Sequence, residues 1–339
     1  MNKQYLYGAL AACLAFSMSA YGKNVDGENK AKAPIKAPAT EPVLHGDTKG
    51  IAMVLVPAGE FIMGSEKVDG EGLQKQYGIE KPIFVDEHPQ QKIALEAFMI
   101  DTYEVSNIQF KEFILKTKRL LPFEWGHNGY GLTMEEAGRM NVDRLRKIGA
   151  DDFKLDMDTR KMSRKALMDV MQKAQAKRDA FPVTGITWDY ANEYCKWRGQ
   201  RLPTEAEWEK AARGPDGLEF PWGNDWNVAK TSTGEGGESE EGYAPVGSYP
   251  QNKSPYGAYD MAGNVWEWTS SWYDRYPGST LENKDFGQNF KVIRGGAGSV
   301  GHYALSYFFR GATRQIADPK MTGEDLGFRC VMDVAGKAN

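Results

Sequence analysis

The sequence predicts a loop-rich domain in which short strands are mixed with helices, and three observations lead to this prediction. The chain has 339 residues, enough for one large domain or two small ones. It contains 37 Gly with 9 Trp, 16 Tyr and 15 Phe, a composition that suits loops held by aromatic packing better than a regular helical bundle. Short apolar runs bounded by turn residues also alternate with segments that begin in helix-capping residues, so both kinds of element are expected.

The first twenty residues have the layout of a cleaved secretory signal. Lys3 supplies the positive start, residues 5–16 are mostly apolar, and the segment ends in small residues at Ala20. Removal of residues 1–20 would give a periplasmic or secreted protein. The alternative at this point is a lipoprotein anchored at Cys13, because Leu-Ala-Ala-Cys resembles a bacterial lipoprotein cleavage box.

The chain then passes from a linker into the domain. Residues 21–49 hold Lys, Ala, Pro, Glu and Asp with few large apolar side chains, which predicts a disordered, solvated linker. The domain is expected to cover residues 50–335. Met53–Val56 and Phe61–Met63 predict two short strands around a Pro-Ala-Gly turn, and residues 93–100 predict another strand.

Three helices are predicted from their terminal residues. Ser106 can cap the first turn of a helix while Gln109 reaches back to it, the arrangement called a capping box. A second capping box begins at Thr204, and its helix is expected to stop at Gly214. The third helix is predicted over Trp188–Trp197, with a glycine soon after its last residue.

Residues 132–180 are interpreted as a charged helical insertion. Both Thr133–Ile148 and Ser163–Arg178 are amphipathic, so each predicts a helix. Residues 143–178 contain eleven Lys and Arg against six Asp. Two interpretations stay open: a solvated helical hairpin that lies on the domain, and an element that docks a partner or acts as a lid.

Charge and hydropathy exclude several functional classes. The formal net charge of −4 argues against a nucleic-acid partner, because proteins of that class normally present a basic face. The body of the chain has no apolar run of about 18 residues, so no transmembrane helix is expected after the signal is cut. No Gly-Xaa-Ser-Xaa-Gly elbow, phosphate-cradling loop or zinc signature occurs in the sequence.

Four blocks of sequence, in a fixed order, resemble the formylglycine-generating enzyme or sulfatase-modifying factor family. The third contains Gly-Asn-Val-Trp-Glu-Trp at residues 263–268, and the fourth ends in Gly-Phe-Arg-Cys at residues 327–330. The blocks are residues 53–65 with 87–89 and 103–107; residues 182–188 with 194–197 and 201–209; residues 256–268; and residues 292–296 with Arg310, Arg314 and 326–330. The resemblance implies an α+β, C-type-lectin-like formylglycine-generating-enzyme fold that is loop-rich and carries a helical insertion.

The resemblance also implies a structural disulfide between Cys195 and Cys330. Export supports the same pairing independently, because disulfides persist in oxidising compartments. From the residues alone, two separate buried thiols are the open alternative.

A calcium site is implied in the third block. Carboxylates and main-chain carbonyls are the hard oxygen ligands that calcium takes in proteins. The implied ligands are the carboxylates of Asp260 and Glu267 and the carbonyls of Gly263 and Val265. A second family site maps to Asn227, Val228, Glu241 and Tyr243, where the loop is rearranged and Glu238 competes with Glu241. Calcium is therefore the expected cofactor.

The redox chemistry of the family depends on a cysteine pair that this chain lacks. By resemblance, the two cysteine positions fall on Gly301 and Ser306, and no cysteine lies between residues 196 and 329. Two thiolates are the soft ligands that select copper(I), so copper and formylglycine formation are not expected here. The resemblance lines the remaining candidate pocket with Trp266, His302, Arg310, Arg314 and Asp325.

The function expected is that of an exported binding or accessory module whose partner is an unidentified periplasmic protein or small-molecule ligand. The alternative is a periplasmic oxidoreductase of the same fold that acts on another substrate, such as a maturing siderophore chromophore. That enzyme would hold copper, iron or an organic cofactor near His302. A lone histidine is more often a structural residue than a base or ligand, and the four arginines near the C-terminus can brace a loop-rich core instead of serving catalysis.

Overall fold

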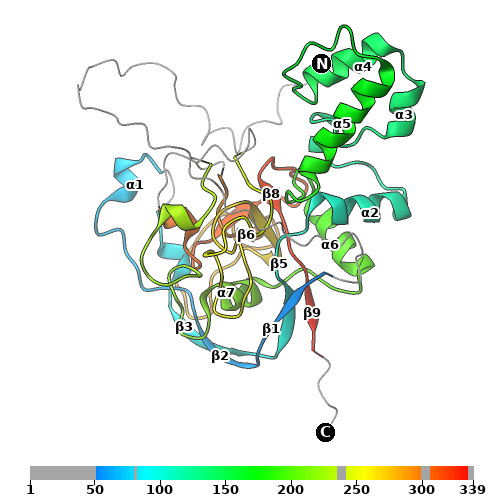
Figure 1. The fold of residues 1–339 in the computed structure, drawn as a ribbon. Helices are drawn as coiled ribbons and strands as arrows, with labels where there is room; N and C mark the ends of the chain where they lie inside the picture. The colour runs from blue at the N-terminus through cyan, green and yellow to red at the C-terminus, as the bar shows by residue number, and fades with distance from the viewer. Residues whose placement is uncertain (1–50, 80–81, 235–241, 299–305, 335–339) are drawn as a thin grey trace, which may run out of the picture. The chain divides into compact units, whose positions relative to one another are not determined.

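The computed structural model describes residues 51–79, 82–234, 242–298 and 306–334 (Figure 1). The predicted signal peptide, the linker and Cys13 lie outside the described residues, and so do Glu241, Gly301 and His302. Among the described segments, every helix is too short or too polar to span a bilayer.

Two small antiparallel sheets are built from the first and last strands of the domain. The three-stranded sheet has the order β1 (Met53–Val56), β4 (Phe98–Asp101), β9 (Val331–Asp333), and the two-stranded sheet pairs β2 (Gly59–Met63) with β3 (Gln91–Leu95). The two strands predicted around the Pro-Ala-Gly turn are present, but they lie in different sheets and do not pair with each other. Lys210 Nζ donates to the carbonyls of Pro57 and Gly59, 2.7 and 2.9 Å away, and so anchors the connection between the two strands to α7.

The single strand predicted over residues 93–100 is also two strands. β3 ends at Leu95 and β4 begins at Phe98, so the chain leaves one sheet and enters the other between them. Phe98 and Ile100 are fully buried beside Trp208, whereas the residues of β3 are only partly buried or exposed. β4 therefore lies deeper in the core than β3 does. A single straight strand over residues 93–100 could not take part in both sheets.

A four-stranded sheet brings the third and fourth sequence blocks side by side. Its order is β7 (Gln315–Ala317), β6 (Lys291–Arg294), β5 (Trp266–Trp272), β8 (Leu326–Gly327), with β5 and β8 parallel and the other pairs antiparallel. Glu267 pairs in register with Arg294 on one side and with Gly327 on the other. Residues separated by tens of positions thus share one sheet, and the site described below is built on it.

The predicted helices are present with the predicted ends. The main helices of the body are α2 (Asn107–Thr117), α6 (Trp188–Trp197) and α7 (Glu205–Arg213), and the shorter ones are α1 (Leu73–Gln76) and α8 (Ser306–Phe309). Three 3-10 turns are η2 (Val85–Glu87), η3 (Glu124–Gly126) and η4 (Val228–Lys230). Ser106 and Thr204 form the capping boxes that start α2 and α7, and α7 ends at Gly214.

The insertion forms three helices instead of two. They are α3 (Met134–Arg139), α4 (Val142–Asp151) and α5 (Arg164–Arg178), drawn in green in Figure 1. The one helix predicted over residues 133–148 breaks after Arg139 because the Asn141 side chain accepts from the Arg144 amide and caps a new helix. These helices share a buried cluster of their own, formed by Ala137, Leu145, Phe153, Leu167 and Met171.

The largest core cluster lies between α2, α6 and the four-stranded sheet. Phe110, Tyr194 and Phe328 are buried there with ring centroids 5.3–6.1 Å apart, so aromatic packing holds much of this core. The domain is α+β and loop-rich and carries a helical insertion, as the sequence predicted.

Candidate functional site

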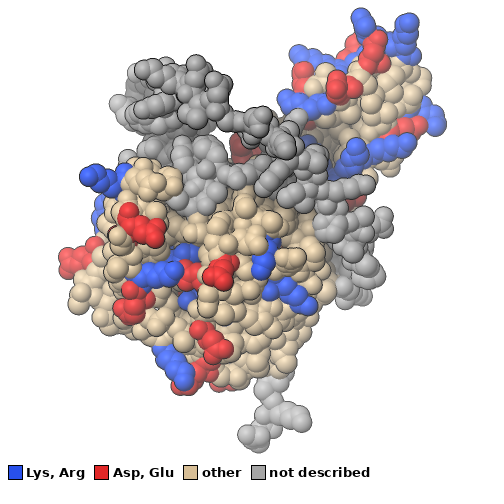
Figure 2. All heavy atoms as spheres, turned by 60° about the vertical axis from the view of Figure 1, so that its left-hand side comes forward, with Lys and Arg blue, Asp and Glu red and all other residues tan. Residues whose placement is uncertain are grey.

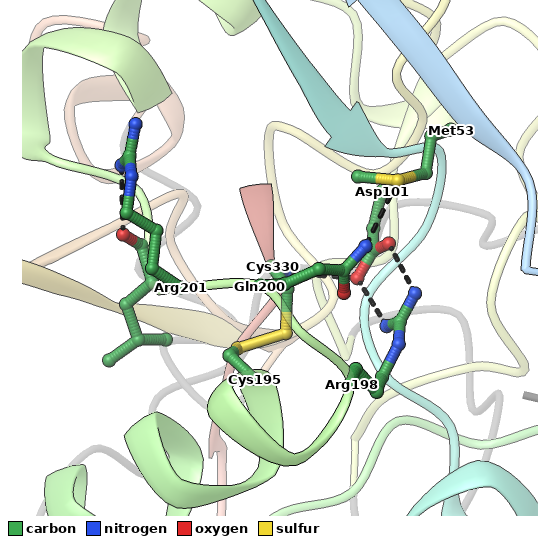
Figure 3. Close-up of a disulfide and its surroundings, with 8 residues drawn as sticks. Met53, Asp101, Cys195, Arg198, Gln200, Arg201 and Cys330 are labelled. Atoms are coloured by element: carbon green, nitrogen blue, oxygen red, sulfur yellow. Dashed lines mark hydrogen bonds and ion pairs between the residues drawn. A yellow bond between two sulfur atoms is a disulfide. The ribbon is translucent and has the colours of Figure 1, made fainter. Parts of the chain in front are cut away.

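A disulfide joins α6 to the segment that precedes β9. Cys195 and Cys330 are both fully buried, with Cα atoms 5.6 Å apart. Asp101 lies beside the bridge: its carboxylate accepts from the Cys330 amide and, at 2.9 and 3.0 Å, from both terminal nitrogens of Arg198 (Figure 3). The disulfide implied by the resemblance is therefore present, and neither cysteine is a thiol in this structure.

Two of the predicted pocket residues are in contact. Trp266 opens β5, is 7% exposed, and donates its amide to the Asp325 carbonyl at 2.8 Å. Ser306, where the resemblance places the second cysteine of the family's pair, is the first residue of α8. Gly301 and His302 lie outside the described residues.

Arg310 is held in a buried ion pair. Its two terminal nitrogens donate to the Glu87 carboxylate at 2.7 and 3.0 Å, and its Nε donates to Glu219. The Arg310 side chain is 3% exposed and Glu87 is not exposed at all. A two-pronged bond of this kind fixes both position and orientation of a guanidinium, so Arg310 braces the loop that contains η2.

Arg314 is paired in the same way with Glu205 on α7. Its Nε and one terminal nitrogen donate to the two Glu205 oxygens at 2.7 and 3.0 Å, and its terminal nitrogens also donate to the carbonyls of Asp86 and Asp274. The rings of Tyr273 and Tyr276 lie 4.9 and 4.2 Å from the guanidinium carbon. Four of the five N–H groups of this arginine thus donate to acceptors inside the protein.

Glu209, one turn along α7 from Glu205, anchors two further arginines. It accepts from Arg213, from the Gly64 amide at 2.7 Å and from Arg294 at 2.6 Å. Burial raises the pKa of a carboxyl, but the Arg294 and Arg213 guanidiniums prevail and hold the pKa of Glu209 below its usual value. We call this set the glutamate–arginine network; its members are Glu205, Glu209, Arg213, Arg294 and Arg314.

A second buried group surrounds Arg329 and contains the predicted calcium ligands. Arg329 donates to both oxygens of Glu267, at 2.6 and 2.7 Å, and Trp208 Nε1 donates to one of them at 2.9 Å. Both carboxylate oxygens of Glu267 thus already have strong donors. Three acidic side chains are gathered here around one guanidinium, and we call them the carboxylate cluster: Glu104, Asp260 and Glu267.

The other two members of the carboxylate cluster face each other. The Glu104 and Asp260 carboxyl groups lie close enough for their charges to interact, and both residues are 2% exposed. Asp260 accepts from the Gly247 amide at 2.6 Å, and one Glu104 oxygen accepts from Asn264 Nδ2 at 3.0 Å. Burial raises the pKa of Glu104 well above its usual value, and the nearby charge of Asp260 raises it further.

The residues implied for calcium fit in part. Asp260 is buried and lies beside other acidic side chains, and calcium takes oxygen ligands of this kind. The Glu267 carboxylate, in contrast, accepts hydrogen bonds from Arg329 through both of its oxygens. No group of three or more His, Cys, Asp or Glu side chains within the described part of the chain is arranged to hold one metal ion. A calcium ion here would therefore need main-chain oxygens, such as the carbonyls predicted at Gly263 and Val265.

The residues implied for a second calcium site lie on separate segments. Asn227 caps η4, with its side-chain oxygen accepting from the Ala229 amide at 3.0 Å. Val228 begins that turn, and Tyr243 is buried with its hydroxyl 3.3 Å from Thr184 Oγ1. Glu241 is outside the described residues, so this second site stays a prediction.

Sequence reasoning missed the acidic partners of the arginines. Glu205 and Glu209 are four residues apart and so lie on one face of α7, but a charged pair at this spacing usually marks a solvated face. Glu104 belongs to the Tyr-Glu-Val-Ser-Asn segment quoted for the resemblance. Its burial beside Asp260 depends on a contact that no local pattern records.

The raised pKa of Asp260 leads to a testable pH dependence. Because burial raises this pKa to about 6 from 3.8, the folded state binds a proton between these values that the unfolded state releases. Stability then increases as the pH falls, so chelator-treated wild-type protein should gain urea resistance relative to Asp260→Asn between about pH 7 and 5. An equal difference between the two urea midpoints at both pH values would contradict this prediction.

The sequence of this chain is similar to a known domain family and to known proteins. The model of the sulfatase-modifying factor enzyme 1-like domain matches residues 38–334. Formylglycine-generating enzyme of Bos taurus is 31% identical to this chain. The aligned region covers 90% of this chain and 79% of the length of that enzyme. Inactive C-alpha-formylglycine-generating enzyme 2 of Bos taurus is also 31% identical. That alignment covers 84% of this chain and 89% of the relative's length.

The fold is shared with a solved structure as well. PvdO from Pseudomonas aeruginosa superposes with a TM-score of 0.53 at 23% identity, covering 83% of this chain and 94% of that one. At this identity the likeness concerns the fold alone. Together with the matched domain, it confirms the α+β, C-type-lectin-like fold class that the resemblance implied.

Proposed function

The chain belongs to the sulfatase-modifying factor family, and from that premise we propose that it is an exported binding or accessory protein that does not convert cysteine to formylglycine. One observation carries the proposal: the sequence has three cysteines, and Cys195 and Cys330 are joined to each other. The third, Cys13, precedes the proposed cleavage site. The mature protein would thus have no thiolate to hold copper(I).

Overall similarity does not separate the active from the inactive branch. The chain is 31% identical both to a formylglycine-generating enzyme and to a relative named as inactive. The residues that the resemblance places at the two redox positions favour the inactive alternative. Gly301 has no side chain, and the Ser306 hydroxyl is a hard, weakly acidic group that does not replace a thiolate.

The paired arginines are held inside the domain and are not free to take part in catalysis. Arg310 and Arg314, which the resemblance places at the pocket, are each held by a buried glutamate through two hydrogen bonds. An arginine that bound a substrate anion would first have to leave such a partner. We therefore assign these two residues to support of the loops around the pocket.

The charged insertion is the proposed partner surface. Its segment 143–178 has eleven Lys and Arg against six Asp, and Figure 2 shows these charges crowded over the insertion helices. An excess of positive charge attracts acidic partners and speeds their association. The proposed partner is a periplasmic protein or a small-molecule ligand with acidic groups.

Export is part of the proposal. The signal at residues 1–20 would be cut after Ala20, leaving residues 21–49 as a linker before the domain. The disulfide supports this assignment, because disulfides of this kind are rare in reducing compartments. Intact mass of the mature protein is the test: a mass beginning at Tyr21 supports the proposal, whereas a lipid on Cys13 identifies the lipoprotein alternative.

The activity itself is tested by copper(I) titration together with an oxygen-consumption assay on a sulfatase-motif peptide. Wild-type protein is expected to bind no stoichiometric copper(I) in competition with a chromophoric chelator and to leave the peptide mass unchanged. The matched variant Gly301→Cys with Ser306→Cys restores the two thiols and is expected to compete for copper(I).

Stoichiometric copper with peptide oxidation by the wild type would overturn the proposal. Iron or an organic cofactor in the purified mature protein, with oxygen consumption on another substrate, would instead establish the oxidoreductase of the same fold. Calcium as the sole metal, with no turnover, is the result expected.

A further inference from the structure

The end of α2 and the turn that follows it expose several large apolar side chains within a short stretch of chain. Leu120 is 84% exposed, and Leu115, Leu121 and Phe123 are exposed as well. A single exposed apolar residue is ordinary in a folded protein, but a cluster of them marks a surface that contacts something other than water. We call residues 115–123 the leucine segment.

The body of the domain holds the leucine segment in this exposed position. The Leu120 carbonyl accepts from the Tyr190 hydroxyl on α6 at 2.7 Å. Three residues later, the Phe123 amide donates to the Gly185 carbonyl at 3.2 Å. The main chain is therefore anchored at both places, and the apolar side chains project from an attached backbone.

The same segment carries positive charge and no negative charge. Residues 113–123 contain Lys116, Lys118 and Arg119 but no Asp or Glu. Two of these cations form surface ion pairs with acidic residues of α2 and α6, and water weakens pairs of this kind. Lys118 has no ionic partner among the described residues. The positive charge is a local feature, because the whole chain has a formal net charge of −4.

Projecting leucines beside lysine and arginine suit the surface of an anionic bilayer. Apolar side chains can enter the boundary between headgroups and acyl chains, while long basic side chains reach the lipid phosphates. A protein partner would need a groove complementary to this projecting segment, because packing at protein interfaces is as close as in protein interiors. A fluid bilayer accommodates such a segment without a preformed groove, so the observations favour lipid.

We propose that the leucine segment docks the mature protein onto a membrane surface that contains anionic lipids. Leu120 and Phe123 enter the interface, and the three basic side chains of the segment bind lipid phosphates. The attachment is peripheral and reversible, because a few apolar side chains bury much less area than a spanning helix does. The inference goes beyond the proposed function, since it requires neither an acidic partner on the insertion nor any catalytic activity.

The test is cosedimentation of the mature chain, beginning at Tyr21, with lipid vesicles. This chain lacks Cys13, so a lipid anchor at that residue cannot contribute. We expect binding to vesicles of equal parts phosphatidylcholine and phosphatidylglycerol, and weaker binding to phosphatidylcholine alone or at high salt. Leu120→Ser with Phe123→Ser should weaken binding at least about 10-fold, because apolar area is lost from the contact. Val68→Ser, which changes an exposed apolar residue of another segment, should bind as wild type does.

A second pair of substitutions separates the charges from the apolar contact. Lys116→Gln with Lys118→Asn removes two cations, and asparagine tolerates the left-handed backbone of Lys118, where φ is 54°. Affinity for the anionic vesicles should fall about 5-fold for each cation removed, whereas affinity for phosphatidylcholine alone should not change. All of these variants should melt at the wild-type temperature, because the altered side chains are exposed.

A dye attached at one position measures insertion directly. Cys195 and Cys330 are joined to each other, so Leu120→Cys gives the mature chain one reactive thiol. Nitrobenzoxadiazole on that thiol should emit at shorter wavelength when the anionic vesicles are added, because it leaves water. The same dye on Val68→Cys is the matched control and should not shift.

Two outcomes would overturn the inference. Absence of wild-type binding to the anionic vesicles would show that the segment does not dock on lipid. Self-association that Leu120→Ser with Phe123→Ser abolishes would in that case assign the segment to a second copy of the chain. Equal binding of wild type and this double variant would show that any lipid contact lies on another surface. Neither outcome bears on formylglycine formation, which the copper and peptide experiment tests separately.

Discussion

Replacing both Cys195 and Cys330 with alanine is expected to lower the free energy of unfolding by about 5 kcal/mol. The bridge closes a loop of 135 residues, and a cross-link that spans a long loop removes much conformational freedom from the unfolded chain. The loop encloses α7 and all four strands of the four-stranded sheet, so the elements that carry the candidate site depend on it. Urea unfolding followed by tryptophan fluorescence measures the effect.

The control for this prediction is the single variant Cys195→Ala. One substitution already removes the cross-link, so the single and double variants should be destabilised to a similar extent. Non-reducing mass spectrometry of the wild type should give a mass two hydrogens below that of the dithiol. Two thiols that react with an alkylating agent in the native protein, or a double variant as stable as wild type, would contradict the prediction.

The second large effect is expected from Glu209→Gln, which should lower the free energy of unfolding by about 3–5 kcal/mol. The substitution keeps the shape of the side chain but removes the negative charge between Arg213 and Arg294, which are 2% and 0% exposed. Two buried guanidiniums would then face each other without the carboxylate that compensates them. The midpoint of urea unfolding, compared at constant pH, measures the loss.

Glu60→Gln is the matched control, because it removes the same charge from an exposed pair. Glu60 bonds Lys92 at 2.8 Å on the surface, and water screens a pair of this kind. Its stability should stay close to that of wild type. If Glu209→Gln cost no more than Glu60→Gln, the glutamate–arginine network would not be a source of stability.

The helices were predictable because their signals are local. Thr204 and Glu207 bond each other's backbone within four residues, so the capping box can be recognised without any tertiary information. The same rule locates the start of α2 at Ser106. Where a local signal was overlooked, the prediction was wrong: Asn141 caps a new helix inside a segment that was assigned to one.

Strand pairing was not predictable from the same kind of pattern. β1 and β2 are separated by a short turn, which is typical of a hairpin, yet each pairs with a later strand in a separate sheet. The connection between them bonds the Lys210 ammonium on α7, more than 150 residues along the chain. A contact of that range leaves no trace in the sequence around the turn.

By itself, the sequence determined the family, the ends of the body helices and the missing thiolate pair, since each depends on residue identity or on neighbours a few positions away. Only the tertiary structure decided which carboxylate meets which guanidinium. Glu87 and Arg310 are 223 residues apart, and Arg329 donates to Glu267 across the sheet, whereas its nearest nitrogen is 3.9 Å from Glu104. The physical reason is that a buried charge is stabilised by whatever the fold brings next to it, whereas a helix cap is satisfied by its own turn.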